Sequence, residues 1–410
     1  MQTHLADFIR DTEAGRLADE ILRRCVHCGM CTATCPTYLA TGDELDSPRG
    51  RIYQIKQVLE GAPATESVQK HLDRCLTCRA CETTCPARVE YAKLLDIGRA
   101  EVERQLGRRP SEKIVREAVR GLMNCPKTFA ALYQAGQLFR PLLPEKLRGK
   151  VLPKQQAGAL PVRQHKRKML ALAGCVQPAM SPNIHAATAR VLDKLGIQLL
   201  TAPEAGCCGA VNLHLSAEEA ALDNMRRNID AWLPYFSDGI EALVINASGC
   251  GVTVKEYGHH LRNDAKYAEK AAFISEKAKD IVEILTDEKA ALAALMPSEN
   301  GAAQRQTLAY HPPCTLQHGQ KLKGSVENLF TGLGLTVYLP QNAHLCCGSA
   351  GTYSLFQPEL SEKLRADKLS ALEALQPDAV LSANIGCIVH LAAESKVPVK
   401  HWIEYLDGLL

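Results

Sequence analysis

The pattern of hydrophobic and polar positions separates a helical N-terminal part from a C-terminal part of mixed elements. Residues 1–24 combine charged side chains with Leu and Ile at helical spacing, which predicts one amphipathic helix. A second helix is predicted over residues 48–61, where Pro48 and Gly61 bracket a helical period. Helices are expected to about Phe139, and residues 140–168 are rich in Pro, Lys and Arg without a clear period. We therefore expect a helical domain at residues 1–140 and a linker at 141–168.

From Met169 onward, short β-prone runs alternate with helical segments, which indicates α/β layers with parallel strands. The expected elements are strands at 169–173, 197–200 and 243–246, with helices at 182–195 and 217–232. The same order then recurs, with strands at 308–310, 335–338 and 380–382 and helices at 320–333 and 358–375. The sequence therefore predicts a duplicated unit, with one copy at 169–300 and the other at 301–410.

Length and charge limit the classes of protein to consider. A chain of 410 residues exceeds what one hydrophobic core usually organises, so two or three domains are expected. The net charge of +3 is small and spread along the chain, so nucleic acid is not expected as a partner. There is no run of 18 apolar residues, and Asp7, Arg10 and Asp11 occupy the region where a signal peptide would be apolar. We expect an intracellular protein that does not span a membrane.

Seventeen cysteines are the unusual feature of the composition, and in a large chain without an export signal they indicate metal or redox chemistry. Eight of them form two copies of the spacing C-x2-C-x2-C-x3-C-P, which is typical of bacterial ferredoxins. The first copy is Cys25, Cys28, Cys31 and Cys35 before Pro36, and the second is Cys75, Cys78, Cys81 and Cys85 before Pro86.

The spacing predicts how these thiolates divide between two 4Fe-4S clusters. Three cysteines at intervals of three wrap one cubane, and the fourth points away and ligates the other cluster. The expected ligands are Cys25, Cys28, Cys31 and Cys85 for cluster 1, and Cys75, Cys78, Cys81 and Cys35 for cluster 2. Zinc is the alternative, but zinc sites do not require eight cysteines in this doubled register. The prediction is an α+β protein with a mainly helical two-cluster ferredoxin-like domain, followed by a duplicated α/β cysteine-rich domain.

Eight further cysteines form two matched CCG patterns. Cys175 precedes Cys207-Cys208-Gly209 by 32 positions, Cys314 precedes Cys346-Cys347-Gly348 by the same interval, and the patterns close at Cys250 and Cys387. This arrangement resembles the cysteine-rich domain of the heterodisulfide-reductase-like family, which implies a possible further iron-sulfur centre in one or both copies. The family's fullest pattern ends in CxxC, whereas Thr253 and His390 stand at the last position here. Three alternatives remain open for each copy: a bound metal or cluster, a redox or structural thiol group, and a set of buried free cysteines.

Weaker signals are single residues. His214, His311, His318, His344 and His390 lie near the CCG cysteines in sequence, but single histidines more often make ordinary hydrogen bonds than bind metal. Cys125 is predicted to be a packed thiol. The chain has no G-x-G-x-x-G fingerprint, so any flavin or nicotinamide chemistry is expected on another chain.

The whole chain resembles the family of iron-sulfur subunits of bacterial glycolate oxidase, also called glycolate dehydrogenase. The matching stretches are CVHCGMCTATCPTY from Cys25, GDELDSPRGRIYQIKQVLEG from Gly42, HLDRCLTCRACETTCP from His71, AGCCGA from Ala205, ASGCG from Ala247, KEYG from Lys255, CTLQHGQKL from Cys314, HLCCGSAGTY from His344 and ANIGC from Ala383. The resemblance implies FAD-containing partner subunits that oxidise glycolate to glyoxylate, and an electron-transfer role for this chain. It also implies a quinone or other respiratory acceptor and a cytoplasmic location, peripheral on the inner face of the membrane.

No catalytic residue is assigned to this chain, because the substrate site is expected on a partner. Two alternatives follow. The first is the equivalent subunit of a lactate or glycerol-3-phosphate dehydrogenase complex. The second is a heterodisulfide-reductase-like thiol-disulfide enzyme that works at Cys207-Cys208 or Cys346-Cys347.

Overall fold

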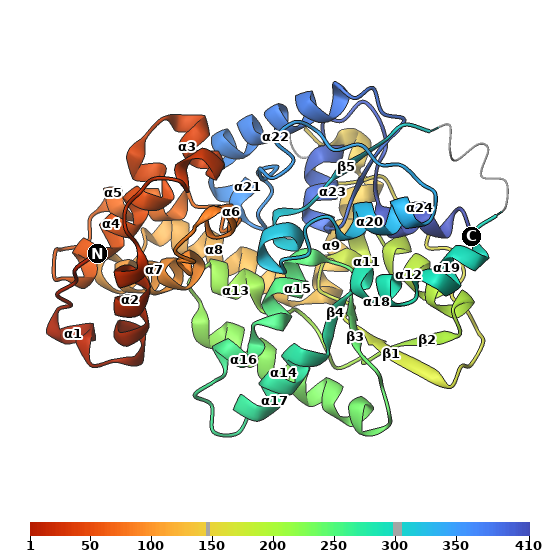
Figure 1. Cartoon of the computed structure of the whole chain (residues 1–410), viewed down its shortest axis with the longest axis horizontal. Helices are drawn as coiled ribbons and strands as arrows, with labels where there is room; N and C mark the ends of the chain where they lie inside the picture. Colours follow the sequence, from red (N-terminus) through yellow and green to blue (C-terminus); the bar gives the residue numbers. More distant parts are fainter. Residues whose placement is uncertain (145–147, 298–305) are drawn as a thin grey trace. The chain divides into compact units, whose positions relative to one another are not determined.

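The computed structural model describes residues 1–144, 148–297 and 306–410, and most of its helices and strands are labelled in Figure 1. The chain divides into two compact units. The first comprises Met1–Glu117 and His344–Asp367, and the second comprises Ala118–Ala343 and Lys368–Leu410. These units are defined by spatial contact, so the sequence-based domain boundaries at 140, 168 and 300 stay predictions. The boundary at 300 lies outside the described residues.

The first unit is built from short helices. They are α1 (Asp7–Arg10), α2 (Glu13–Arg24), η1 (Thr32–Thr34), α3 (Pro36–Thr41), η2 (Glu44–Asp46), α4 (Pro48–Leu59), α5 (Glu66–Asp73), α6 (Ala80–Thr84), α7 (Tyr91–Leu106) and α21 (Tyr353–Phe356). Helices α8 (Pro110–Asn124) and α22 (Pro358–Glu373) begin in this unit and end in the second. The apolar faces of α2, α4 and α7 form its core, which includes the fully buried Ile21, Ile55 and Leu94.

Two helices in the first unit test the sequence-based expectations. The prediction of a single helix over residues 1–24 is wrong, because the helix is interrupted between α1 and α2. Thr12 lies at the break, and its hydroxyl accepts a hydrogen bond from the backbone N–H of Gly15, which caps the N-terminus of α2. The helix predicted over residues 48–61 is confirmed as α4, where the Ser47 side chain caps the first turn and Pro48 occupies the first helical position.

The second unit contains two sheets and the helices that cover them. Its helices are α9 (Pro126–Leu138), η3 (Arg140–Leu142), α11 (Gln177–Met180), α12 (Asn183–Lys194), α13 (Ala210–His214), α14 (Glu218–Ser237), α15 (Ser248–Lys255), α16 (Tyr257–His260), α17 (Ala268–Lys277), α18 (Ile281–Asp287), α19 (Lys289–Leu295), η5 (Thr315–Gly319), α20 (Ser325–Gly332), α23 (Ile385–Ala392) and α24 (Trp402–Asp407). Among the described residues, no helix combines the length and the apolar character needed to cross a bilayer.

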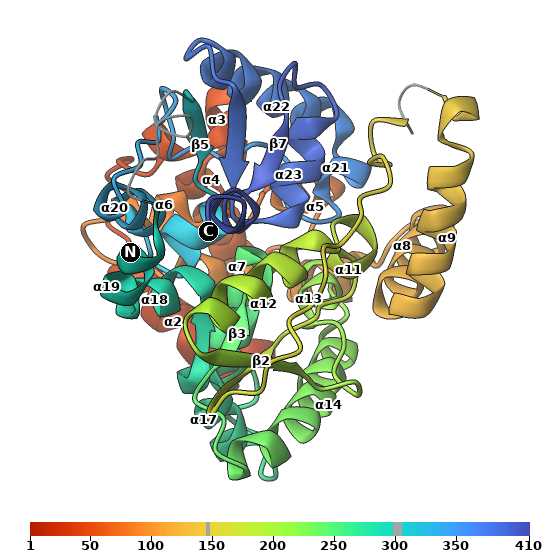
Figure 2. The ribbon, with the colours of Figure 1, turned by 90° about the vertical axis from the view of Figure 1, so that its right-hand side faces the viewer.

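The two sheets are both parallel. The first has the order β2-β1-β3-β4, formed by β1 (Arg167–Ala171), β2 (Ile197–Thr201), β3 (Leu243–Ile245) and β4 (Ala278–Asp280). The second has the order β5-β6-β7, formed by β5 (Leu308–His311), β6 (Ala379–Ser382) and β7 (Val399–His401). Figure 2 shows α12 on one side of the first sheet and α14 and α17 on the opposite side. This is the α/β layering that the alternating pattern predicted.

The sheets confirm the duplication. In the first sheet β2 lies beside β1, and in the second the chain at Tyr338 lies beside β5 through two backbone hydrogen bonds of 2.8 Å. The strand predicted over 335–338 is wrong in extent, because the chain pairs there only as an isolated bridge between Ala309 and Tyr338. Strands β4 and β7 were not predicted. Each ends at a residue that caps the next helix in a capping box, Asp280 before α18 and His401 before α24.

Candidate functional site

The two ferredoxin-type loops have the same backbone course. Cys25 directly follows α2 and Cys75 lies two residues after α5. In each loop the second residue after this cysteine has a positive φ, +57° at His27 and +53° at Thr77. The fourth residue does so too, with +84° at Gly29 and +61° at Arg79. These left-handed positions curl the chain tightly enough to turn successive cysteines toward one centre.

The first cysteine set surrounds an open cavity, whose volume of about 460 Å³ includes the solvent space at its entrance. Its cysteine lining includes the four expected for cluster 1, namely Cys25, Cys28, Cys31 and Cys85. Cys28 is exposed at this site, and the neighbouring Val26 and Met30 are 70% and 54% exposed. One edge of the cavity therefore reaches the surface beneath apolar side chains.

The second set surrounds a cavity of about 290 Å³. Its cysteine lining is the set expected for cluster 2, namely Cys35, Cys75, Cys78 and Cys81. Pro48, Cys81 and Tyr91 line both cavities, so the two sites are immediate neighbours. The structure thus brings together the eight residues in the two predicted groups, and their assignment as ligands stays a prediction.

A buried ionic network lies beside the second cavity. Arg51 is 1% exposed, and its guanidinium donates hydrogen bonds to the His71 carbonyl at 2.7 Å, to Thr37 Oγ1 at 3.1 Å and to Asp46 Oδ1 at 3.3 Å. Asp46 also contacts Arg74 Nη1 at 2.9 Å. Burial alone would lower the pKa of Arg51, but the charges of Cys75, Tyr91, Cys35 and Asp46 raise it above its ordinary value. A fixed positive charge therefore stands at the second cavity.

Several donors point at the sulfurs of this cavity. Arg51 Nη1 lies 3.9 Å from Cys35 Sγ, the backbone N–H of Thr77 donates to Cys75 Sγ at 3.4 Å, and the Tyr91 hydroxyl donates to the same sulfur at 3.6 Å. Net charge, hydrogen bonds to sulfur and solvent exposure are the protein's means of setting a cluster's reduction potential. Arg51 and these donors therefore favour the more negative, reduced state of a group bound in the second cavity.

The donor set fits a cationic group. Burial raises the pKa of Cys31 to about 11, with a further contribution from the charges of Cys25, Cys85 and Cys35. Burial also raises the pKa of Cys81 well above its ordinary value. Thiols gathered in this way ionise together when a positive centre binds among them, as iron does in a cluster. The cavities and their donors are thus compatible with 4Fe-4S clusters.

In the first repeat, the structure gathers all four CCG cysteines. Cys207 accepts hydrogen bonds from the thiols of Cys175 and Cys208. A further hydrogen bond joins Cys208 and Cys250. The two thiol donors lower the pKa of Cys207 below its ordinary value, and the Gly209 N–H and Arg227 add to this effect against the cost of burial. The same hydrogen bonds raise the pKa of Cys175 and Cys208.

A hydrogen-bonded clamp holds the vicinal pair of the first repeat. Asn228 accepts from the Gly206 N–H at 2.8 Å and donates to the Cys207 carbonyl at 2.8 Å. The Tyr257 hydroxyl donates to the Cys208 carbonyl at 2.9 Å, and Asn228 also donates to this hydroxyl at 3.1 Å. Asn228 and Tyr257 are fully buried, so these bonds stand in a low-dielectric environment where they fix the loop.

The CCG cysteines of the second repeat belong to segments of different units. Cys346 and Cys347 lie in the His344–Asp367 segment of the first unit, where the Tyr353 hydroxyl donates to the Arg74 carbonyl at 3.1 Å. Burial and the charges of Cys75 and Cys346 raise the pKa of Tyr353. Cys314 and Cys387 lie in the second unit, and both are buried.

The cysteine and the histidines that were considered singly in the sequence differ in their burial. Cys125 was expected to be packed, which is wrong, because it is exposed at the N-terminus of α9 and its sulfur lies 3.0 Å from Thr128 Oγ1. Among the five histidines near the CCG cysteines, His311 is fully buried at the end of β5. Sequence reasoning missed the roles of Asp46, Arg51, Asn228 and Tyr257. All except Asn228 lie within stretches that carry the family resemblance, which was the one available signal.

Family models match both parts of the chain. A 4Fe-4S dicluster domain matches residues 21–89, and a cysteine-rich domain matches residues 169–255 and again 308–392. The match to the dicluster domain covers both ferredoxin-type loops, and the repeated match confirms the duplication. The chain therefore contains a 4Fe-4S-binding part and two cysteine-rich repeats.

Two curated relatives match along all or most of the chain, and a third matches just over half of it. The chain is 53% identical to the glycolate oxidase iron-sulfur subunit of Escherichia coli (strain K12), over 100% of this chain and 99% of that protein. It is 29% identical to a probable glycolate oxidase iron-sulfur subunit of Bacillus subtilis (strain 168), over 92% of this chain and 89% of that one. A lactate utilization protein A of Bacillus cytotoxicus is 25% identical, over 57% of this chain and 96% of its own length.

Proposed function

Because the chain belongs to the family of glycolate oxidase iron-sulfur subunits, we propose that it is the electron-transfer subunit of a glycolate-oxidising complex. In this proposal FAD-containing partner subunits oxidise glycolate to glyoxylate, and this chain takes the electrons from them. It passes them to a quinone or another respiratory acceptor. The complex is then cytoplasmic and peripheral on the inner face of the membrane.

The observation that carries the proposal is the pair of neighbouring cavities. Each is lined by four or more cysteines, and Pro48, Cys81 and Tyr91 form part of both walls. When bound in these cavities, two 4Fe-4S clusters supply one-electron steps, which a two-electron flavin donor needs for its reoxidation. We assign Cys25, Cys28, Cys31 and Cys85 to one cluster and Cys75, Cys78, Cys81 and Cys35 to the other.

The chain's own residues give the two sites different properties. The first cavity opens beside the exposed Cys28, which brings one site close to solvent and to any docking partner. The second is enclosed by Arg51, Arg79 and Tyr91. Since exposure and local charge tune reduction potentials, Arg51 favours the reduced state of the cluster at the second site.

The alternative of a thiol-disulfide enzyme has less support. Exchange requires a thiolate that a disulfide substrate can reach. Cys207 and Cys347 are fully buried, and Cys208 and Cys346 are each 3% exposed. The alternative of a lactate-linked complex concerns the partner's substrate, so it must be tested on the assembled complex.

The test is to purify the chain anaerobically with its co-expressed flavin subunits and to measure substrate-dependent dye reduction, iron and acid-labile sulfide. We expect reduction with glycolate, and about eight irons per chain from the two cysteine sets. Dye reduction with lactate alone would overturn the substrate assignment. Thiol-disulfide activity of the cluster-replete chain without flavin subunits would favour the second alternative instead.

A further inference from the structure

The imidazole of His311 is buried without hydrogen-bond partners. His311 is the last residue of β5 and is 0% exposed. Neither Nδ1 nor Nε2 has a hydrogen-bond partner among the residues that the structure describes. Leaving a buried polar atom unsatisfied costs about 1–3 kcal/mol, so such a side chain in a native core calls for an explanation.

Two other buried histidines of the chain each have a partner on Nδ1. His71 Nδ1 lies 2.8 Å from Asp46 Oδ1, and His401 Nδ1 accepts a hydrogen bond from the Ile403 N–H at 3.1 Å. These two rings have ordinary structural roles, as an ion-pair member and a helix cap. His311 has neither role, although its backbone is fixed by the Ser382 hydroxyl, which donates to the His311 carbonyl at 3.0 Å.

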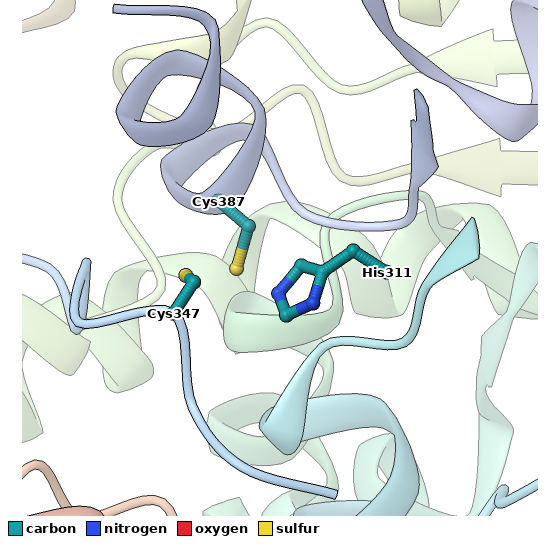
Figure 3. Close-up of side chains that lie close together, drawn as sticks. All are labelled: His311, Cys347 and Cys387. Atoms are coloured by element: carbon teal, nitrogen blue, oxygen red, sulfur yellow. The ribbon is translucent and has the colours of Figure 1, made fainter. Parts of the chain in front are cut away.

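A buried thiol faces the ring. A ring nitrogen of His311 and Sγ of Cys387 lie within 4.8 Å of one another, and Figure 3 shows the two side chains together, one at the end of β5 and the other on α23. Cys387 is 4% exposed and sits in the first turn of α23. Asn384 Nδ2 donates to this sulfur at 3.6 Å.

The first repeat lacks this pair. His311 stands three residues before Cys314, and the residue three before Cys175 is Leu172, which is 4% exposed in the hydrophobic core. A buried leucine needs no hydrogen-bond partner, whereas the ring nitrogens of a buried imidazole do. The two repeats have therefore diverged at the residue that points toward the closing cysteine of the second.

We propose that His311 and Cys387 are two ligands of a single zinc-type metal ion held in the second cysteine-rich repeat. Imidazole nitrogen with thiolate sulfur is a donor set that Zn²⁺ prefers. Two ligands of one zinc ion stand at most about 4.4 Å apart, from Zn–S and Zn–N bonds of about 2.3 and 2.1 Å. Ligands on different irons of a cubane are farther apart because the cluster lies between them.

A zinc ion in the second repeat would affect the path of the electrons. Zinc has no redox chemistry in proteins, so the second repeat would be a structural site and the electrons would not pass through it. This inference goes beyond the proposed function and does not depend on it, since it would hold for any substrate of the flavin partners.

The test measures zinc and iron in the full chain, purified without chelators, by mass spectrometry. We expect about one zinc per chain in the wild type, and loss of most of it in His311→Ala and in Cys387→Ser, with iron and labile sulfide unchanged. The control variants are His165→Ala, whose ring contacts Asp193 at 2.8 Å, and the exposed Cys125→Ser. Both should keep their zinc.

A variant that keeps a metal ligand at position 311 distinguishes loss of the ligand from loss of the fold. His311→Cys should still bind one equivalent, and after Co²⁺ exchange its thiolate-to-cobalt charge-transfer absorption should be stronger than that of the wild type. Zinc absent from the wild type, or retained in His311→Ala, would overturn the proposal. A loss of iron instead of zinc in His311→Ala would also overturn it, and would indicate an iron-sulfur centre with a histidine ligand.

Discussion

The guanidinium of Arg51 lies 3.9 Å from the sulfur of Cys35, and both side chains are buried. Arg51 is further held by the His71 carbonyl and by Asp46, so its charge cannot swing away into solvent. A positive charge at this place stabilises whichever state of the neighbouring centre is more negative. The reduced state of a cluster is always the more negative one.

We therefore expect Arg51→Gln to lower the reduction potential of one of the two clusters, by on the order of 60 mV, which is a tenfold change in a one-electron equilibrium. The potential is measured by redox titration followed by low-temperature EPR. Arg51→Lys keeps the charge and should recover part of the shift, and the exposed Arg23→Gln should leave both potentials unchanged. Unaltered potentials in an Arg51→Gln protein with full iron content would refute this role.

Cys28 and Cys125 are both exposed cysteines, but only Cys28 lines a cavity of the ferredoxin-type part. Cys28→Ser should remove one thiolate ligand and lose about four of the expected eight irons, together with the electron transfer of the complex. Cys125→Ser should retain both. If Cys28→Ser kept its iron and its full activity, the assignment of the cluster 1 ligands would be wrong.

Gly348 follows the vicinal cysteines of the second repeat and has a φ of +91°. A Cβ at this position would lie 2.6 Å from the backbone oxygen of Ser361. Gly348→Ala should therefore lower the free energy of unfolding by about 1 kcal/mol from the left-handed backbone and by roughly 1–3 kcal/mol more from the clash.

Gly351 provides the matched control in the same segment. Its φ is +61°, and an added Cβ would meet nothing within 4 Å, so Gly351→Ala should show the backbone effect alone. The two variants are compared by thermal unfolding at equal cofactor content. Equal losses in both would show that the close approach of Ser361 does not matter.

Asp280 supplies a pH dependence. Burial raises its pKa from 3.8 to about 6, even though the Val282 N–H and the Gln320 side chain donate to its oxygens. Between these two values the folded state holds a proton that the unfolded state has released. The contribution of Asp280 to stability therefore falls as the pH rises through this window, by at most about 3 kcal/mol.

Asp280→Asn removes the titration and keeps an acceptor for the helix cap. Its free energy of unfolding relative to the wild type should rise between pH 4.5 and 7 and level off above that. The exposed Asp378→Asn serves as the control. A difference between Asp280→Asn and wild type that is constant with pH would contradict the raised pKa.

The sequence by itself determined the local and repetitive features of this protein. Cysteine spacing alone predicted the two groups that the structure gathers around two cavities. This was possible because the geometry of a ligand loop depends mainly on residues close to one another in sequence. The duplication was visible for a similar reason, since matched intervals between cysteines and alternating elements repeat whatever the surroundings are.

Tertiary structure decided what surrounds these groups. The buried charge of Arg51 beside Cys35, the clamp of Asn228 and Tyr257 on the vicinal cysteines, and the unpartnered ring of His311 beside Cys387 all join residues distant in sequence. Periodicity cannot show such pairs, and neither could it show that residues 335–338 would pair only at Tyr338 or that Cys125 would be exposed. Burial and long-range contact set charge, hydrogen bonding and metal affinity, and these arise only when the chain has folded.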